Sequence, residues 1–195
     1  MALSLVTPPT SEPITVDEAK LHLKITPDVT TDDSLIEALI TAAREWVETF
    51  THRAVPVQTW DLALDGFPCD GGPIVLPKAP TISITSVTYV ATDGTSTVWS
   101  SALYMTDLPV GPTARRGTVL PAYGECYPVT RAVPRAVTVR FVAGYLATTA
   151  IPDPVPVAMK VCLLEHVRAN YGRGTEDRVE TMQWIERNLW AYKSF

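Results

Sequence analysis

The sequence has few cysteines and no long hydrophobic run. Its three cysteines, Cys69, Cys126 and Cys162, are odd in number and far apart, which argues against a disulfide framework and a clustered zinc site. No apolar segment is long enough to cross a bilayer, and residues 1–13 lack the basic and apolar regions of a signal peptide. We therefore expect a soluble protein that is not exported, keeps its thiols reduced and has no membrane partner.

Basic residues are also in the minority. The chain has 16 lysines and arginines against 21 aspartates and glutamates, for a formal net charge of −5. Because lysine and arginine supply most of the non-specific affinity for duplex DNA, this balance argues against a duplex-binding surface. It remains compatible with a conduit through which DNA passes.

The motifs of several enzyme classes are absent: there is no GxSxG, no phosphate loop, no GxGxxG and no HExxH. One local arrangement has possible chemistry. Cys162 and His166, four positions apart on an expected helix and close to Glu165, could hold half of a zinc site. No second ligand pair accompanies them, so we interpret them as core residues and expect no cofactor. A small metal-assisted or cysteine enzyme is the alternative.

What the sequence does contain is enough apolar material for a core. Of its 195 residues, 46% are hydrophobic, which favours a compact domain over a disordered tail. Seventeen prolines without a repeating period indicate many interrupted strands and loops. We expect a single domain over residues 1–195.

Two helices are predicted near the start. Thr15 and Glu18 have the spacing of a capping box, which begins a helix that runs to about Lys24. Asp32 and Asp33 could be paired catalytic carboxylates, but their place before an apolar-periodic segment favours a capping role. That segment carries apolar residues at three- and four-residue steps: Leu35, Ile36, Leu39, Ile40, Ala43, Trp46, Val47 and Phe50.

The pattern then changes to the alternation of strands. Residues 57–65 place Trp60, Leu62 and Leu64 on one face, and Asp93-Gly94 is typical of a hairpin turn. The other candidate strands are residues 74–76, 82–91, 97–104, 118–120 and 136–143.

Helical spacing returns after Pro152, Pro154 and Pro156. We expect helices at 157–171 and 176–190, the second with one apolar face formed by Val179, Met182, Ile185 and Leu189. The predicted fold is α+β, with N-terminal helices (14–53) and C-terminal helices and tail (155–190) in a small bundle beside an inserted, mostly antiparallel β-sheet lobe (57–145).

Two groups of residues are candidate interfaces. The C-terminal aromatics either complete the core or anchor a partner: Trp184, Trp190, Tyr192 and Phe195. The middle of the chain is locally basic and the first helices are acidic, which indicates either two solvated faces or contact between neighbours in a ring. The basic candidates are Arg115, Arg116, Arg131 and Arg135.

Several segments resemble the phage head-tail connector (adaptor) family, as found in tailed phages and gene transfer agents. The N-terminal ones are ITVDEAKLHL at 14–23, DDSLI at 32–36 and AAREWVE at 42–48. Later ones look like the larger version with an inserted sheet: LDGFP at 64–68, LP at 76–77, PAYG at 121–124 and FVAGY at 141–145. The resemblance covers about residues 14–171. The family often has glycine after the long helix, where this sequence reads Thr51-His52-Arg53.

The resemblance implies a structural role without turnover. It implies a ring, usually of twelve copies, at the head-tail junction of the virion, assembled in the host cytoplasm. The ring would bind the portal protein, extend the DNA channel without sequence-specific binding and meet the next tail component, the stopper. On this interpretation the aromatics contact the portal, and the arginines contact a neighbouring subunit or the tail protein. A stopper or tail-completion protein is the alternative within the same class.

Overall fold

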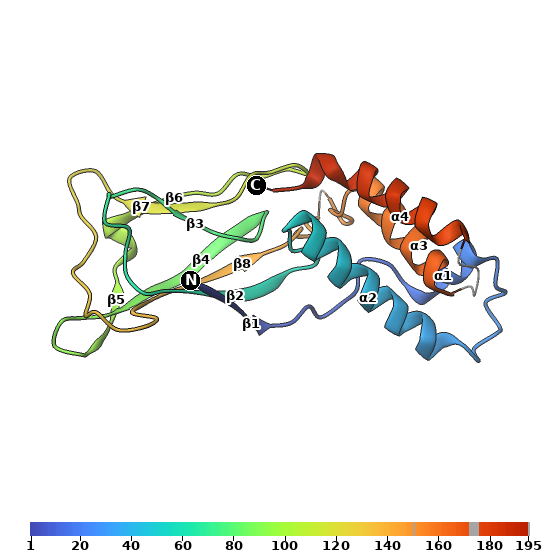
Figure 1. The fold of residues 1–195 in the computed structure, drawn as a ribbon, viewed down its shortest axis with the longest axis horizontal. Coiled ribbons are helices and arrows are strands. Elements are labelled where there is room, and N and C mark those ends of the chain that lie inside the picture. Colours follow the sequence, from blue (N-terminus) through green and yellow to red (C-terminus); the bar gives the residue numbers. More distant parts are fainter. Residues whose placement is uncertain (150, 172–175, 195) are drawn as a thin grey trace.

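The computed structural model describes residues 1–149, 151–171 and 176–194. Figure 1 shows an elongated molecule with helices at one end, called the bundle, and strands at the other, called the lobe. The helices are α1 (Val16–Leu23), α2 (Asp33–Thr51), α3 (Val157–Tyr171) and α4 (Glu176–Leu189). The strands are β1 (Ala2–Thr7), β2 (Gln58–Leu64), β3 (Ile74–Val75), β4 (Thr81–Val90), β5 (Ser96–Trp99), β6 (Tyr104–Asp107), β7 (Thr118–Pro121) and β8 (Val137–Ala143). The predicted α+β class is confirmed.

The bundle begins as the sequence predicts. Thr15 Oγ1 accepts from Glu18 N at 3.1 Å, and Glu18 Oε2 accepts from Thr15 N at 2.7 Å, which completes the capping box of α1. The stripe of α2 is buried through Ile36, Ile40 and Val47, each at most 2% exposed. It packs with buried residues of α3 and α4 in one cluster, so the predicted stripe is correct except for Leu35 in the first turn, which is 49% exposed. None of the described helices is both long and apolar enough to cross a membrane.

The capping prediction for Asp32 and Asp33 is correct for their position and their charge at the start of α2, but wrong for the hydrogen bond to the backbone. Asp32 stands at the N-cap of α2 without a side-chain cap bond, and its Oδ2 instead accepts from the Tyr171 hydroxyl at 2.6 Å. Asp33 pairs at 2.5 Å with the buried Lys20 ammonium. Each carboxylate thus accepts from a side chain of another helix in place of a backbone amide of α2. The two acids therefore connect α2 to α1 and α3.

The exit of α2 is left-handed although glycine is missing. His52 is the C-cap residue with φ 57°, a region in which histidine is less disfavoured than most side chains. The chain therefore turns toward the lobe with the geometry that a glycine would give.

The main sheet of the lobe has five strands in the order β1-β2-β8-β4-β5, and every neighbouring pair is antiparallel. Its registers line side chains up in rows across the strands. One row on the inner face consists of Leu3, Leu62, Val139, Val87 and Trp99. The members of this row lie in the apolar core of the lobe or pack against it, because alternate residues of a strand face the same way.

The outer face of this sheet carries small and mostly uncharged side chains. Its rows include Ala2, Ala63, Thr138, Thr88 and Val98. The Arg140 guanidinium and the Asp61 carboxylate form a bidentate pair there, at 2.8 and 2.7 Å, so these two charges neutralise each other.

A second sheet, with the order β3-β7-β6, covers the inner face. The sequence predicts one strand over 97–104, but the chain leaves β5 at Trp99, makes a short 3-10 helix at Ser101–Leu103 and enters β6 in this other sheet. Trp99 and Tyr104, with ring centroids 5.0 Å apart, pack on both sides of that break. Their burial requires a bend that alternation alone does not reveal.

Strand β1 has no counterpart in the sequence prediction, which assigned no element to residues 2–7. It pairs with β2, about sixty positions along the chain, from Ala2 opposite Ala63 to Thr7 opposite Thr59. A partner so far away leaves no local signal.

Candidate functional site

The C-terminal tail folds back from α4 onto the end of α2. Ser194 N donates to Thr51 O at 2.9 Å, and Ser194 Oγ donates to His52 O at 3.2 Å. In Figure 1 the chain end accordingly reaches from α4 toward the lobe. The tail thus forms part of the contact between bundle and lobe.

This fold-back divides the predicted aromatic group. Tyr192 is half-buried and packs against the bundle core, whereas Trp184 and Trp190 are 41% and 60% exposed. The Lys193 ammonium lies over the Trp190 ring, 5.1 Å from its centroid. Phe195 lies outside the described residues. Among the described members of this group, the two tryptophans present the large aromatic surface that a partner could bind.

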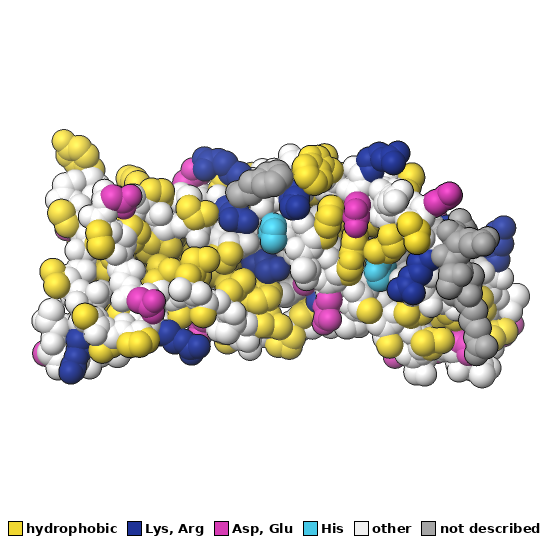
Figure 2. Space-filling view, viewed as in Figure 1, with side chains coloured by type: hydrophobic (Ala, Val, Ile, Leu, Met, Phe, Trp, Pro, Cys, Tyr) yellow, Lys and Arg dark blue, Asp and Glu magenta, His cyan; other side chains and the backbone are white. Residues whose placement is uncertain are grey.

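The four predicted arginines do not form one patch. Arg115 is exposed and pairs with Asp107 at 2.5 Å, while the Arg116 guanidinium donates to Ser194 O at 3.0 Å and is half-buried at the junction. Arg131 and Arg135 are exposed elsewhere, beside the β4–β5 turn and the end of β2. Figure 2 shows basic side chains gathered around a histidine near the middle of the face, and Arg116 belongs to such a group, since it lies with Lys78 and Lys193 near His52.

A buried polar junction, which the sequence patterns did not predict, joins bundle to lobe. Its first half centres on the Glu48 carboxylate, which accepts from Val55 N at 2.8 Å, Gln58 Nε2 at 2.6 Å and Arg44 at 3.1 Å. Burial raises the pKa of Glu48, against the hydrogen bond from Val55 and the positive charge of Arg44, which lower it. Glu48 therefore fixes the chain where it passes from α2 into β2.

Arg53, 1% exposed, forms the second half. Its guanidinium donates to Ala114 O at 2.8 Å, to Tyr192 O and to the Tyr145 hydroxyl at 3.4 Å. The acceptors belong to the loop before β7, the C-terminal tail and the segment after β8. One side chain thus holds three distant segments, which fixes the bundle relative to the lobe. A charged residue directly after the long helix was the only sequence signal.

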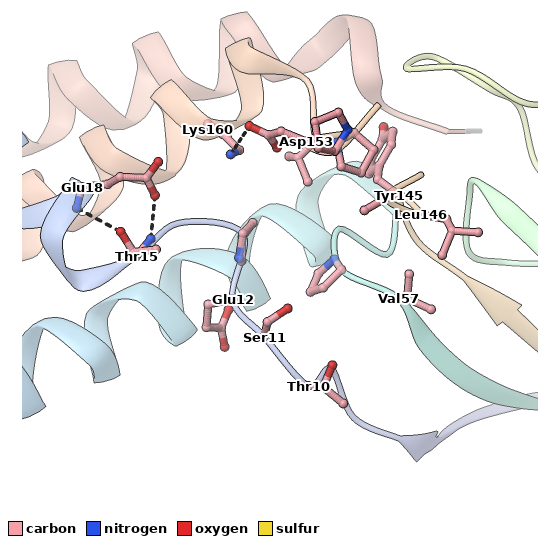
Figure 3. A pocket seen from close by; sticks show the side chains of 16 residues that line it. Thr10, Ser11, Glu12, Thr15, Glu18, Val57, Tyr145, Leu146, Asp153 and Lys160 are labelled. Carbon is pink, nitrogen blue, oxygen red and sulfur yellow. Dashed lines mark hydrogen bonds and ion pairs between the residues drawn. The ribbon is translucent and has the colours of Figure 1, made fainter. Parts of the chain in front are cut away.

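The shallow groove in Figure 3, with a volume of about 440 Å³, runs between the segment before α1 and the segment that joins β8 to α3. Its charged side chains already have partners. Lys160 pairs with Asp153 at 2.5 Å, Glu18 belongs to the capping box, and Glu12 pairs with Arg44 at 2.9 Å. The groove therefore offers no free charge for catalysis or for an ionic ligand.

The alternative site at Cys162 does not have the geometry of a reaction centre. Cys162 is fully buried, and burial raises its pKa to about 11, so the thiol stays protonated at neutral pH. Burial also lowers the pKa of His166, whose ring packs 5.4 Å from that of Trp46. Glu165 turns away to His22, at 3.2 Å. Among the described residues, no three histidine, cysteine or acidic side chains are grouped for a metal ion.

The model of the phage gp6-like head-tail connector protein family matches residues 13–94. The chain is also similar in fold to a chain in the neck of an empty gene transfer agent (GTA) particle, with a TM-score of 0.77 and 23% identity over 100% of this chain and 96% of that one. A chain in the neck of a native GTA particle, solved with C12 symmetry, gives a TM-score of 0.72 and 21% identity over the same shares. No curated protein matches the chain. Residues 13–94 therefore match the phage gp6-like head-tail connector family, and the whole chain shares its fold with chains of GTA necks.

Proposed function

We propose that this protein is a structural head-tail adaptor of a phage or gene transfer agent particle. Twelve copies form a ring between the portal protein and the next tail component, and the ring extends the DNA channel. The observation that carries this proposal is the TM-score of 0.77 to a GTA neck chain over the full chain, together with the match of residues 13–94 to the connector family. The C12 symmetry of one similar neck supports twelve copies.

The shape of the molecule suits a joining role. Bundle and lobe lie at opposite ends, so each can meet a different neighbour (Figure 1). The buried bonds of Glu48 and Arg53 hold the two ends in fixed relative positions. Such a rigid connection transmits position between two partners, which is what a joint requires, and it needs no catalytic group.

The charge distribution suits a channel that DNA traverses without binding. The net charge is −5, and acidic side chains lie among the basic ones over most of the face that Figure 2 shows, apart from a small basic group around a histidine near its middle. Because tight non-specific DNA binding needs many phosphate contacts from an extended basic surface, one small basic group on a chain of net negative charge should still let DNA pass. We expect no sequence-specific contact.

The exposed tryptophans of α4 and the tail are the proposed portal contact, and Tyr192 and Phe195 are further candidates for it. Replacing Trp184 and Trp190 with alanine should abolish co-purification with the portal, since aromatic anchors carry much of the energy of an interface. Leu21→Ala, at an 80% exposed position of α1, is the control and should bind normally. Unchanged portal binding by the tryptophan variant would assign the contact to another surface.

The exposed arginines are the proposed contact to a neighbouring subunit or the next tail protein. Arg115→Glu, Arg131→Glu and Arg135→Glu should each weaken ring or tail joining if the respective site is used. Arg116 is a poor probe, because its guanidinium is bonded to the tail and reversal would disturb the junction. Full tail joining in the triple variant would contradict this part of the proposal.

Electron microscopy of particles from a strain that lacks the gene tests the function as a whole. We place the protein at the head-tail junction of a virion that is assembled in the host cytoplasm. The mutant should therefore produce separate heads and free tails, and the gene supplied in trans should restore joined particles. Intact tailed particles would overturn the proposal. If another protein still forms a ring on the portal of the mutant heads, the missing protein would instead be a stopper or tail-completion protein.

A further inference from the structure

The five-stranded sheet ends in two strands that each have a single neighbour in the part of the chain that the structure describes. Strand β1 closes one side and β5 the other. Five of the six β1 residues are exposed, and Val98 in the middle of β5 is 65% exposed. An edge strand has a row of backbone N–H and C=O groups that can pair with another strand.

Strand β1 has little protection along its edge, since its one irregularity is a bulge between Leu5 and Thr7, after the regular segment Ala2–Ser4. Residues 2–7 read ALSLVT, without the charged residues or proline that normally prevent pairing between molecules. The residues of β5, STVW, are equally uncharged. Neither edge therefore repels the other, and both favour extended backbone through β-branched and aromatic residues.

A closed ring requires unlike surfaces that fit each other, because each subunit meets the next head to tail. The two edges of one sheet meet this requirement, since they differ and lie on opposite sides of the same subunit. We propose that β1 of one copy pairs through its backbone with β5 of the next copy, so that the main sheets join into one continuous sheet around the ring. This inference rests on the proposed ring.

The strand directions fix the type of pairing. All four neighbouring pairs in the sheet are antiparallel, so β1 and β5, the first and fifth strands, run in the same direction. Rotation about a ring axis close to the strand direction preserves that direction. The contact between copies is therefore a parallel pair, and it should resist high salt because it involves no charge.

The side-chain faces give a test. A joined sheet keeps its faces continuous, so Val98 must come beside an outer-face residue of β1, which is Ala2 or Ser4. Leu5 points to the inner face of the same strand. Within one copy, β1 and β5 are separated by four strand spacings, about 19 Å. A disulfide needs Cα atoms within roughly 7 Å, so a bond between these strands must join two copies.

The experiment uses particles that carry the variants in a background with the exposed thiols removed (Cys69→Ser and Cys126→Ser). Ala2→Cys and Ser4→Cys are each combined with Val98→Cys, the particles are oxidised with copper phenanthroline, and chains are separated without reductant. We expect a ladder of covalent multimers with at least one outer-face pair, at low and high salt alike. The matched pair Leu5→Cys with Val98→Cys should remain monomeric.

Three results would contradict the inference, and they differ in what they overturn. Monomers from both outer-face pairs, in particles whose necks contain the ring, overturn the edge pairing alone. Dimers from Ser4→Cys without the second cysteine indicate that β1 pairs with β1, which also overturns it. Joined particles that lack a ring of this protein at the neck overturn the proposed function, and the edge pairing with it.

Discussion

Bundle and lobe bury different kinds of side chain. The bundle and its exit toward the lobe enclose Lys20, Arg44, Glu48, Arg53 and His166, each at most 8% exposed. Within residues 57–145, all of which the structure describes, no buried residue carries a charge. The lobe is instead filled by aliphatic residues and by aromatic rings such as those of Trp99 and Phe141.

This difference separates two physical tasks. An apolar core contributes stability through area removed from water and through dense packing, without strong directionality. Buried charged groups contribute little net stability but need specific partners, which makes the geometry around them unique. The lobe therefore supplies a stable body, and the charges of the bundle and junction determine how the parts are oriented. The following variants test this division.

The largest expected effect is in the core of the lobe. Phe141 is fully buried in the middle of β8, and Phe141→Ala should lower the free energy of unfolding by about 3–5 kcal/mol, through lost burial and the cavity left behind. Urea denaturation followed by circular dichroism measures it. Thr138→Ala, on the outer face of the same strand, is the control and should stay within about 0.5 kcal/mol of the parent. Equal losses in the two variants would mean that the apolar core is not what stabilises the lobe.

Removal of the Arg53 guanidinium should come next. Arg53→Met keeps much of the apolar stem but leaves three acceptors without their donor, at a cost of about 2–4 kcal/mol. The C-terminal tail should also become sensitive to limited proteolysis, because its bond to Arg53 is lost. Arg131→Met, at an exposed position, should do neither. A stable Arg53 variant with a protected tail would show that packing alone orients the two parts.

Protonation of His166 in the bundle should change the free energy of unfolding by less than the two substitutions above. Burial, helped by the charge of Arg178, lowers the pKa of His166, which favours the neutral imidazole in the folded protein. As the pH falls below 6.5, the ordinary value, the unfolded chain takes up a proton first, and stability decreases until the pH passes the lowered folded pKa. His166→Phe should reduce that decrease, measured by urea denaturation between pH 7.5 and 5.5.

Two other groups, His52 and Glu48, also make the stability depend on pH. Burial also lowers the pKa of His52, which adds a decrease of the same sign, while the raised pKa of Glu48 acts in the opposite direction. The informative quantity is therefore the difference between variant and parent at each pH. Thr138→Ala should keep the parental slope, and an unchanged slope in the His166 variant would locate the titration elsewhere.

The smallest expected effect concerns the reactivity of the three cysteine thiols. Cys69 and Cys126 of the lobe are exposed, whereas Cys162 of the bundle is buried with a pKa of about 11. A thiol reagent at pH 8 should therefore label two cysteines rapidly and the third only in denaturant, because the thiolate is the reactive form. Cys162→Ala should leave the rapid phase unchanged. Rapid labelling of all three would mean that the bundle opens readily.

Local features were predicted well from the sequence. The Thr15–Glu18 capping box, the buried face of α2 and the turn at Asp93-Gly94, where Gly94 has φ 93°, are all present. The predicted apolar face of the last helix is correct for Ile185 and Leu189, which are buried, but wrong for Val179, which is 62% exposed. Caps, turns and helix faces depend on residues within a few positions, so their signal is contained in a short segment. The connector motifs are built of the same local features.

Only the tertiary structure decided the rest. Arg53 meets Tyr192, and Asp32 meets Tyr171, across 139 positions of the chain. The edge strand β1, the division of the strands into two sheets and the separation of Arg116 from Arg131 likewise depend on which distant segments come together. A buried polar group takes whichever partner the completed fold brings within about 3 Å, and a strand takes whichever edge is open. Those choices are made by packing, so residue patterns along the chain do not record them.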